Sequence, residues 1–337
     1  MGSVRSTSEL QSRALLAGGV PAVEEVRNGI HAIALAMPAM QPTYAYSYAI
    51  LAGGSSRDVH IVDAGLDTDA NWETFCAAIE ALDRHVTDIV SVTVTHLHFD
   101  HTGLANRIRE ASGARVRMHG DEAAAIRAGL QFSAGHDVGD KFSEWGVPAA
   151  ERAALLEIAN SRADFGSSVV VDDELRDGQI LDFGEHRARV IHTPGHTTGH
   201  ICLALLGENA VFTGDHVLPG INPGIALGGR RSPDPLGEYY ASLERLEPYA
   251  DAEALPGHGF RFSPLGARCA EIRAHHEART AQAAQQLAET PNLPVWELAS
   301  RLTWTGGWDA LPVVSRVSAL AQTDMHAARV ATVSAAE

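Results

Sequence analysis

The stretch Thr95-His96-Leu97-His98-Phe99-Asp100-His101 concentrates imidazole and carboxylate groups at one point of the chain. Residues 90–94 before it alternate valine with serine or threonine, which predicts a strand that ends where the stretch begins. In extended backbone His96 and His98 point to the same side, and a turn into a helix swings the aspartate and the last histidine back towards them. A chance motif of this kind in a chain of this length has a probability on the order of 1%. We therefore predict a metal site here.

Strand-like and helix-like segments alternate on both sides of this stretch, as in α/β proteins. Strands are predicted at 44–50, 59–63, 90–94, 115–118, 169–171, 179–182, 188–192, 200–206, 210–213 and 252–255, and helices at 71–85, 102–111 and 235–246. The second half repeats the order of the first half, with strands followed by a helix and a strand. We therefore expect two halves that face each other.

Three segments fall outside this alternation. Residues up to about Leu10 are polar and rich in serine, and we expect a loose terminus there. Residues 120–165 lack strand character and are predicted to form a helical insertion over the site. The chain after residue 265 is predicted to be helical, with a break at Pro291 and Pro294.

The composition is that of a folded globular protein with excess negative charge. The chain has 337 residues, of which 45% are hydrophobic, and its formal charge is −16. This charge repels nucleic acid and anionic membranes, so we expect a small-molecule substrate and neither of those partners. The three cysteines form no C-x-x-C pair, and no stretch approaches the ~18 apolar residues of a membrane span. We expect a cytoplasmic protein without a signal peptide, and a homodimer as one option.

Three further residues of ligand type lie beside glycines in predicted loops. They are His196 in Pro194-Gly195-His196, Asp215 in Thr213-Gly214-Asp215 and His258 in Gly257-His258-Gly259. Glycine permits the tight turns and close backbone approach that a site built from several loops requires. Each residue alone is more often structural than functional, but their order after successive strands favours one shared site.

Together these motifs resemble those of metallo-β-lactamase-fold hydrolases of the binuclear, glyoxalase II-like type, across residues 20–285. The resemblance implies a four-layer αββα sandwich, and residues 286–337 resemble the C-terminal helical or winged-helix-like extension of some members. It assigns His96, His98 and His196 to a first metal, Asp100, His101 and His258 to a second, and Asp215 to a bridge between them. Asp63 would orient a ligand histidine. Because Asp215 stands where some true β-lactamases carry a cysteine ligand, a dedicated β-lactamase is not expected.

This ligand set predicts a hydrolytic enzyme. Five imidazoles and two carboxylates suit two Zn²⁺ per chain, with iron or manganese as competitors. Two such ions about 3.5–4 Å apart lower the pKa of a shared water towards about 7 and so supply a hydroxide nucleophile. Asp100 is the expected catalytic residue, because it can relay a proton. We predict cleavage of an ester, thioester, lactone or related acyl bond of a small molecule.

Three other functions remain open. A phosphodiesterase or nuclease on the same fold needs a basic groove, but the sequence has no basic cluster beyond Arg230-Arg231. An iron-dependent dioxygenase of the same superfamily is the second, although its flavodiiron-type relatives carry glutamate where His98 stands. A binding protein with a vestigial site is the third, and the presence of all seven ligands disfavours it.

Substrate contacts are expected in segments that flank the metals. Met37 and Met40 could form an adaptable apolar wall or pack in the core. Tyr44 shares a strand face with Tyr46 and Tyr48, a row that is either sheet packing or a ligand platform. Other candidates are Arg230 for a substrate carboxylate or phosphate, Phe132, Phe142 and Trp145 as a cap, and His200 and His216 as structural or supporting histidines.

Overall fold

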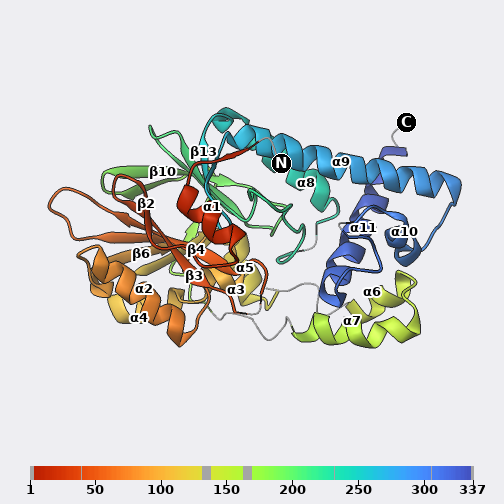
Figure 1. Cartoon of the computed structure of the whole chain (residues 1–337), viewed down its shortest axis with the longest axis horizontal. Coiled ribbons are helices and arrows are strands. Elements are labelled where there is room, and N and C mark those ends of the chain that lie inside the picture. The colour runs from red at the N-terminus through yellow and green to blue at the C-terminus, as the bar shows by residue number, and fades with distance from the viewer. Residues whose placement is uncertain are drawn as a thin grey trace.

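The computed structural model describes residues 4–38, 40–130, 138–161, 169–230, 232–304 and 306–334. Two seven-stranded sheets face each other, and helices cover their outer faces (Figure 1). The first sheet has the order β2 (Glu24–Arg27), β3 (Ile30–Ala36), β4 (Tyr44–Leu51), β5 (Val59–Val62), β6 (Ile89–Thr93), β7 (Arg115–His119), β8 (Asp173–Leu175). The second has the order β1 (Arg5–Ser6), β14 (Phe262–Ser263), β13 (Glu253–Pro256), β12 (Ala210–Gly214), β11 (Ile201–Leu205), β10 (His186–His192), β9 (Ile180–Phe183).

The connections between strands determine which strand ends meet. From β2 to β5 each strand is antiparallel to the one before it, whereas β5, β6 and β7 are parallel to one another and are joined through helices. In the second sheet β12 and β13 are parallel, with α8 (Pro235–Arg245) between them in sequence. Because the carboxyl ends of parallel strands lie at the same edge of a sheet, the loops after them are brought together.

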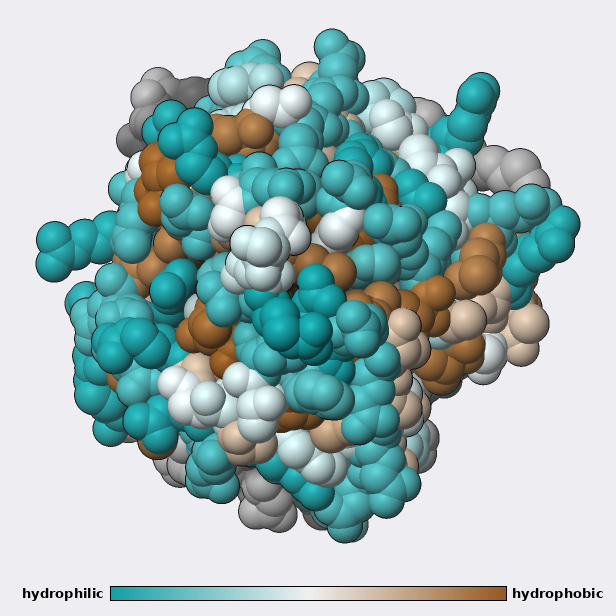
Figure 2. All heavy atoms as spheres, turned by 90° about the vertical axis from the view of Figure 1, so that its left-hand side faces the viewer, coloured by the Kyte–Doolittle hydropathy of each residue, from teal (hydrophilic) through white to brown (hydrophobic). Residues whose placement is uncertain are grey.

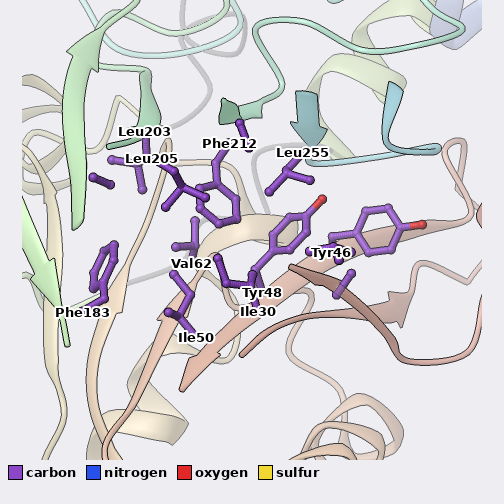
Figure 3. Close-up of a cluster of buried hydrophobic side chains, with 14 of the residues drawn as sticks. Ile30, Tyr46, Tyr48, Ile50, Val62, Phe183, Leu203, Leu205, Phe212 and Leu255 are labelled. Atoms are coloured by element: carbon purple, nitrogen blue, oxygen red, sulfur yellow. The ribbon is translucent and has the colours of Figure 1, made fainter. Parts of the chain in front are cut away.

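The main core lies between the two sheets. Its side chains come from alternate positions of strands in both sheets, including Ile30, Tyr48, Leu203 and Phe212 (Figure 3). The period of two along β4 explains this, since every second residue faces the opposite sheet. The tyrosine row of β4 therefore packs in the core. Its hydroxyls are satisfied across the sandwich, where Tyr48 donates to the carbonyl of Pro256 at 2.8 Å.

Two outer cores attach the helices to the sheets. Helices α2 (Asp69–Ala81) and α4 (Ala105–Ser112) pack on the first sheet through Phe75, Ile79 and Ile108. Helices α8 and α9 (Leu265–Glu289) pack on the second sheet through Leu243 and Ile272. The predicted four-layer αββα sandwich with added helical segments is thus confirmed (Figure 1).

The described part of residues 120–165 is helical, and its part from residue 138 onward packs against the C-terminal helices. The remaining helices are α3 (Phe99–Thr102), α5 (Gly120–Arg127), α6 (Val138–Glu144), α7 (Ala149–Ser161), α10 (Val295–Arg301) and α11 (Val313–Ser334). Phe142, Trp145 and Leu155 of the insertion pack with Val317 and Leu320 of α11. Figure 1 shows α7 beside α11. The boundary expected at residue 286 falls within α9, and the division into a catalytic domain and an extension stays a prediction. Phe132 lies outside the described residues.

The N-terminal segment differs from the expected loose terminus. Strand β1 pairs with β14, and α1 (Glu9–Leu16) follows it. The side chain of Ser8 accepts a hydrogen bond from the backbone N–H of Gln11 at 3.0 Å and so caps α1. A serine-rich sequence therefore marks a helix start here, and the prediction of a loose segment up to about Leu10 was wrong from residue 5 onward.

Hydrophilic side chains cover most of the end of the sandwich that lies opposite the C-terminal helices (Figure 2). Apolar residues reach this surface in scattered groups. No helix among the described residues is both long and apolar enough to cross a membrane.

Candidate metal centre

The predicted ligands lie on loops at the carboxyl ends of four strands. Strand β6 leads into His96 and His98, and the short helix α3 that follows carries Asp100 and His101. The other ligand-type residues are His196 after β10, Asp215 after β12 and His258 after β13. The structure thus brings all seven residues to one edge of the sandwich, although 162 positions separate the first from the last in sequence.

These residues form two groups of potential ligand atoms. His96, His98, His196 and Asp215 form one group, and Asp100, His101 and His258 form the other. Within each group the ligand atoms lie within 4.8 Å of one another, and all seven side chains are buried. Asp215 connects the groups, since its Oδ2 lies 3.7 Å from Nε2 of His196 and 3.3 Å from Nε2 of His258.

Each of the five histidines has one ring nitrogen hydrogen-bonded on the side away from the centre. The outer nitrogens of three rings face backbone carbonyls, which can only accept. These contacts are His98 to Leu227 at 2.9 Å, His196 to Gly224 at 2.7 Å and His258 to Tyr44 at 2.6 Å. His101 Nδ1 lies 2.8 Å from Asp63, and His96 Nδ1 lies 3.0 Å from the hydroxyl of Thr95. The outer nitrogens are therefore the N–H donors, and this fixes the tautomer of each neutral ring.

The inner nitrogens consequently present lone pairs to one another. Nε2 of His96 lies 2.9 Å from Nδ1 of His98, and that atom lies 3.1 Å from Nε2 of His196. Lone pairs at these separations repel unless a cation lies between them. The donor set therefore fits a divalent metal ion, and nitrogen and carboxylate ligands are those that Zn²⁺ prefers.

Two orphaned atoms where the two groups meet fit a second cation. Nε2 of His101 and Oδ1 of Asp215 are buried, approach each other to 3.4 Å, and make no hydrogen bond within the described residues. Oδ2 of Asp100 lies 3.2 Å from Nε2 of His258. Buried polar atoms without partners are rare in folded proteins, and a bound ion is one standard explanation.

The electrostatics differ between the groups. Burial lowers the pKa of His96 and lowers that of His196 to about 4, so both rings are neutral at pH 7. Burial opposes protonation of His258 as well, but the charges of Asp215 and Asp100 raise its pKa to about 10. Against burial, His101 and His258 lower the pKa of Asp100 to about 2. The second group therefore has a strongly negative potential that favours a bound cation.

Asp63 supports two of these histidines from outside the centre. Its Oδ1 accepts from the backbone N–H of Thr95 at 2.7 Å, and its Oδ2 accepts both from His101 Nδ1 and from the Thr95 hydroxyl, the latter at 2.9 Å. Because the Thr95 hydroxyl donates its one proton to Asp63, its oxygen accepts the hydrogen bond from Nδ1 of His96. Asp63 has φ of 60°, a left-handed conformation that aspartate and asparagine tolerate better than most residues. One carboxylate thus orients rings from both groups.

Glu122 is a supporting residue that the sequence analysis did not identify. It is fully buried at the start of α5, where its Oε2 accepts from the backbone N–H of Leu97 at 2.7 Å and its Oε1 accepts from that of Gly199. These bonds join the loop of His96 and His98 to the loop of His196. Burial raises the pKa of Glu122 to about 7, although the hydrogen bonds oppose this effect. A glutamate in a first helical turn is usually exposed, so the sequence carries no signal for this contact.

Histidines outside the seven have local roles. Nε2 of His200 accepts from the backbone N–H of Asp215 at 3.1 Å and so positions that loop, whereas His216 is buried among aromatic rings. His119, Asp121 and His192 form a third group. One nitrogen of each ring is engaged locally, since His192 Nε2 lies 2.9 Å from the carbonyl of Thr198 and His119 Nδ1 accepts from the backbone N–H of Asp121 at 3.3 Å.

The residues expected to contact substrate lie in different environments. Tyr44 is 1% exposed and donates to the carbonyl of Gly259 at 2.7 Å, so the structure corrects its role to core packing and support of His258. Met37 is also buried, and Met40 is half-buried. Arg230 is exposed and lines a cavity beside the loop of His196.

The sequence matches the metallo-beta-lactamase superfamily over residues 42–258, more than half of the chain. The chain therefore belongs to the metallo-beta-lactamase superfamily. This match includes all seven predicted ligands and Asp63, but it names no substrate.

Three individual proteins that this chain resembles share between 25% and 34% of the aligned residues with it. The chain is 34% identical to lactamase-like protein adaB of Aspergillus niger over 133 residues, which is 40% of this chain and 37% of that protein. It is 27% identical to human acyl-coenzyme A thioesterase MBLAC2 over 64% of this chain and 73% of that protein. Among solved structures, the metallo-beta-lactamase family protein TTHA1429 from Thermus thermophilus has a TM-score of 0.73 and 25% identity, covering 91% of this chain and 95% of its own.

Proposed function

We propose that this protein is a metal-dependent hydrolase that cleaves the acyl bond of a small thioester, ester or lactone and uses two zinc ions. The observation that carries the proposal is the set of five imidazoles whose outer nitrogens are fixed by hydrogen bonds and whose inner nitrogens converge. The thioester is placed first because MBLAC2, which this chain resembles over much of its length, is named as a thioesterase.

The ligand types support the choice of metal. Imidazole and carboxylate ligands suit zinc, and iron and manganese also accept them. His96, His98 and His196 would hold one ion, Asp100, His101 and His258 the other, and Asp215 would bridge the two. When bound, such a pair polarises the acyl carbonyl and supplies hydroxide near neutral pH.

The protein's own residues would orient the reaction and move the proton. Asp63, Thr95 and Glu122 hold the ligand loops in place, so little reorganisation is needed. Asp100 is ionised at neutral pH and can accept the proton of the attacking water. As the bond to the acyl carbon breaks, Asp100 returns that proton to the leaving sulfur or oxygen.

The test is hydrolysis by the zinc-loaded protein of a panel of acyl thioesters, esters and lactones, compared with the variants His98→Ala and His275→Ala. His275 is a half-buried histidine on α9 outside the centre, which makes it a matched control. We expect turnover by wild type and His275→Ala, its loss in His98→Ala, and its loss and recovery on removal and return of zinc. Activity that survives in a metal-loaded His98→Ala protein would contradict the proposal.

A further inference from the structure

A cavity of about 270 Å³ lies between α11 and the segments that carry His196 and the α8 N-terminus. We call it the α11 pocket. Apolar side chains from three separate parts of the chain line it, namely Trp145, Ile225, Val317, Ala321 and Met325. Its volume is close to the lower end of the range for small-molecule sites, about 300 Å³, and its apolar lining is typical of them.

The α11 pocket shares a wall with the candidate metal centre. The carbonyls of Gly224 and Leu227 accept hydrogen bonds from His196 and His98, while Ile225 and Ala226 between them line the pocket. The wall is anchored by backbone bonds, from Ala226 N–H to the carbonyl of Gly195 at 2.7 Å and from Leu227 N–H to that of His196 at 2.8 Å. A group in the pocket is therefore next to the loops that hold two predicted ligands.

The charges of the described lining residues do not select a charged occupant. Among these residues the basic ones are Lys141, Arg230 and Arg329, and the acidic ones are Asp234, Glu238 and Asp324. Arg329 pairs with Asp234 at 2.9 Å, and Lys141 pairs with Glu144 at 2.9 Å. Since the two signs balance and two of the cations are already paired, the apolar lining dominates recognition.

We infer that the α11 pocket binds the aliphatic chain of the acyl group whose carbonyl is attacked at the metal centre. The inference rests on the proposed function, and it adds that the substrate is a medium- or long-chain acyl compound. Burial of each methylene group contributes about 0.8 kcal/mol, which corresponds to about a fourfold gain in kcat/KM per methylene. We expect this gain until the chain fills the pocket.

The test narrows the pocket with Ala321→Phe, since Ala321 faces it from α11. The matched control is Ala281→Phe, which adds the same ring at an exposed position of α9. Substrates are the acetyl, hexanoyl and dodecanoyl thioesters of N-acetylcysteamine. We expect Ala321→Phe to lower kcat/KM at least about tenfold for dodecanoyl and less than about twofold for acetyl, with no change in the control. Equal losses for all chain lengths, or none, would overturn the inference.

A binding measurement separates this inference from the proposed function. Calorimetric titration with dodecanoate needs no turnover, and we expect weaker binding in Ala321→Phe than in wild type or Ala281→Phe. If no thioester is hydrolysed but dodecanoate binds more weakly to Ala321→Phe than to the other two proteins, the assignment of the pocket to an aliphatic chain is supported and the proposed function fails. If hydrolysis occurs without chain-length preference and dodecanoate binds all three proteins alike, the pocket assignment fails. Ala328→Phe, at an exposed pocket position, replaces Ala321→Phe if that variant does not fold.

Discussion

Asp63 is the residue on which the orientation of both ligand groups depends. Asp63→Asn keeps the size and tolerates the left-handed backbone, but it puts an NH₂ group or a weaker acceptor against His101 and Thr95. We expect zinc affinity to fall about 10- to 100-fold, the usual effect of losing such a partner. Competition with a chromophoric chelator measures it, and Asp58→Asn, an exposed substitution, is the control. Unchanged affinity in Asp63→Asn would contradict this role.

Glu122 provides a second test at residue scale. In Glu122→Gln one oxygen still accepts, but the new NH₂ group faces the backbone N–H of Leu97 or Gly199 and cannot bond to it. We expect a loss of zinc affinity of about 10-fold or more and a lower kcat with little change in KM, because the ligand loops separate while the α11 pocket stays intact. Glu122 lies beside the surface residue Asp121, so Asp121→Asn is a local control. If only global stability falls, Glu122 is structural and this prediction fails.

The raised pKa of His258 predicts how metal binding depends on pH. With a pKa of about 10 in the metal-free protein, His258 carries a proton at pH 7, and a cation must displace it. Raising the pH removes this competition, so zinc affinity should rise by up to about tenfold per unit between pH 6 and pH 8. Calorimetry in two buffers of different ionisation enthalpy should detect the released proton. An affinity that does not change with pH over this range would be inconsistent with His258 as a ligand.

The motif of residues 95–101 and the three glycine-flanked loops made most of the centre predictable from sequence. Their partners were not predictable, because Gly224, Leu227 and Tyr44 act through backbone carbonyls, which leave no residue-specific pattern. Glu122 was missed because its role depends on where α5 lies relative to two loops that are distant in sequence.

At the scale of elements, the turn after β12 sets the position of Asp215. Gly214 has φ of 47°, and a Cβ atom there would lie 2.7 Å from Nε2 of His200 and 2.8 Å from the hydroxyl oxygen of Thr95. Gly214→Ala should therefore destabilise the fold by about 1–3 kcal/mol and also weaken zinc binding. Gly178→Ala is the control, since Gly178 has φ of 77° but nothing within 4 Å of the added carbon. Chemical denaturation and metal affinity give the two readouts, and equal effects of both variants would count against crowding at Gly214.

Periodicity predicted the order of elements better than their limits. The strand expected at 169–171 lies at Asp173–Leu175, where Arg115 and Arg109 pair with the adjacent Asp173 and Asp172. In the predicted run of valines Val169 is buried and Val170 is exposed, and pairing with β7 rather than side-chain type determines where β8 begins. The N-terminal segment was misjudged for a similar reason, since its pairing partner β14 is more than 250 residues away.

At the scale of the molecule, the sandwich supplies the centre and the added helices supply one side of the α11 pocket. The insertion and α11 share a core built from Phe142, Trp145, Val317 and Leu320. The sequence predicted helices in both segments, in the insertion from its lack of strand character, but it could not show that the two pack together, because that contact joins parts of the chain about 170 residues apart.

The most direct test of a two-metal centre is the metal content of the purified full-length protein, measured by elemental mass spectrometry before and after incubation with zinc and removal of the excess. We expect about two zinc ions per chain, and fewer in His98→Ala than in His275→Ala. One iron per chain would contradict the zinc hydrolase and favour oxygen chemistry. A chain that retains no metal after zinc addition would contradict the centre itself.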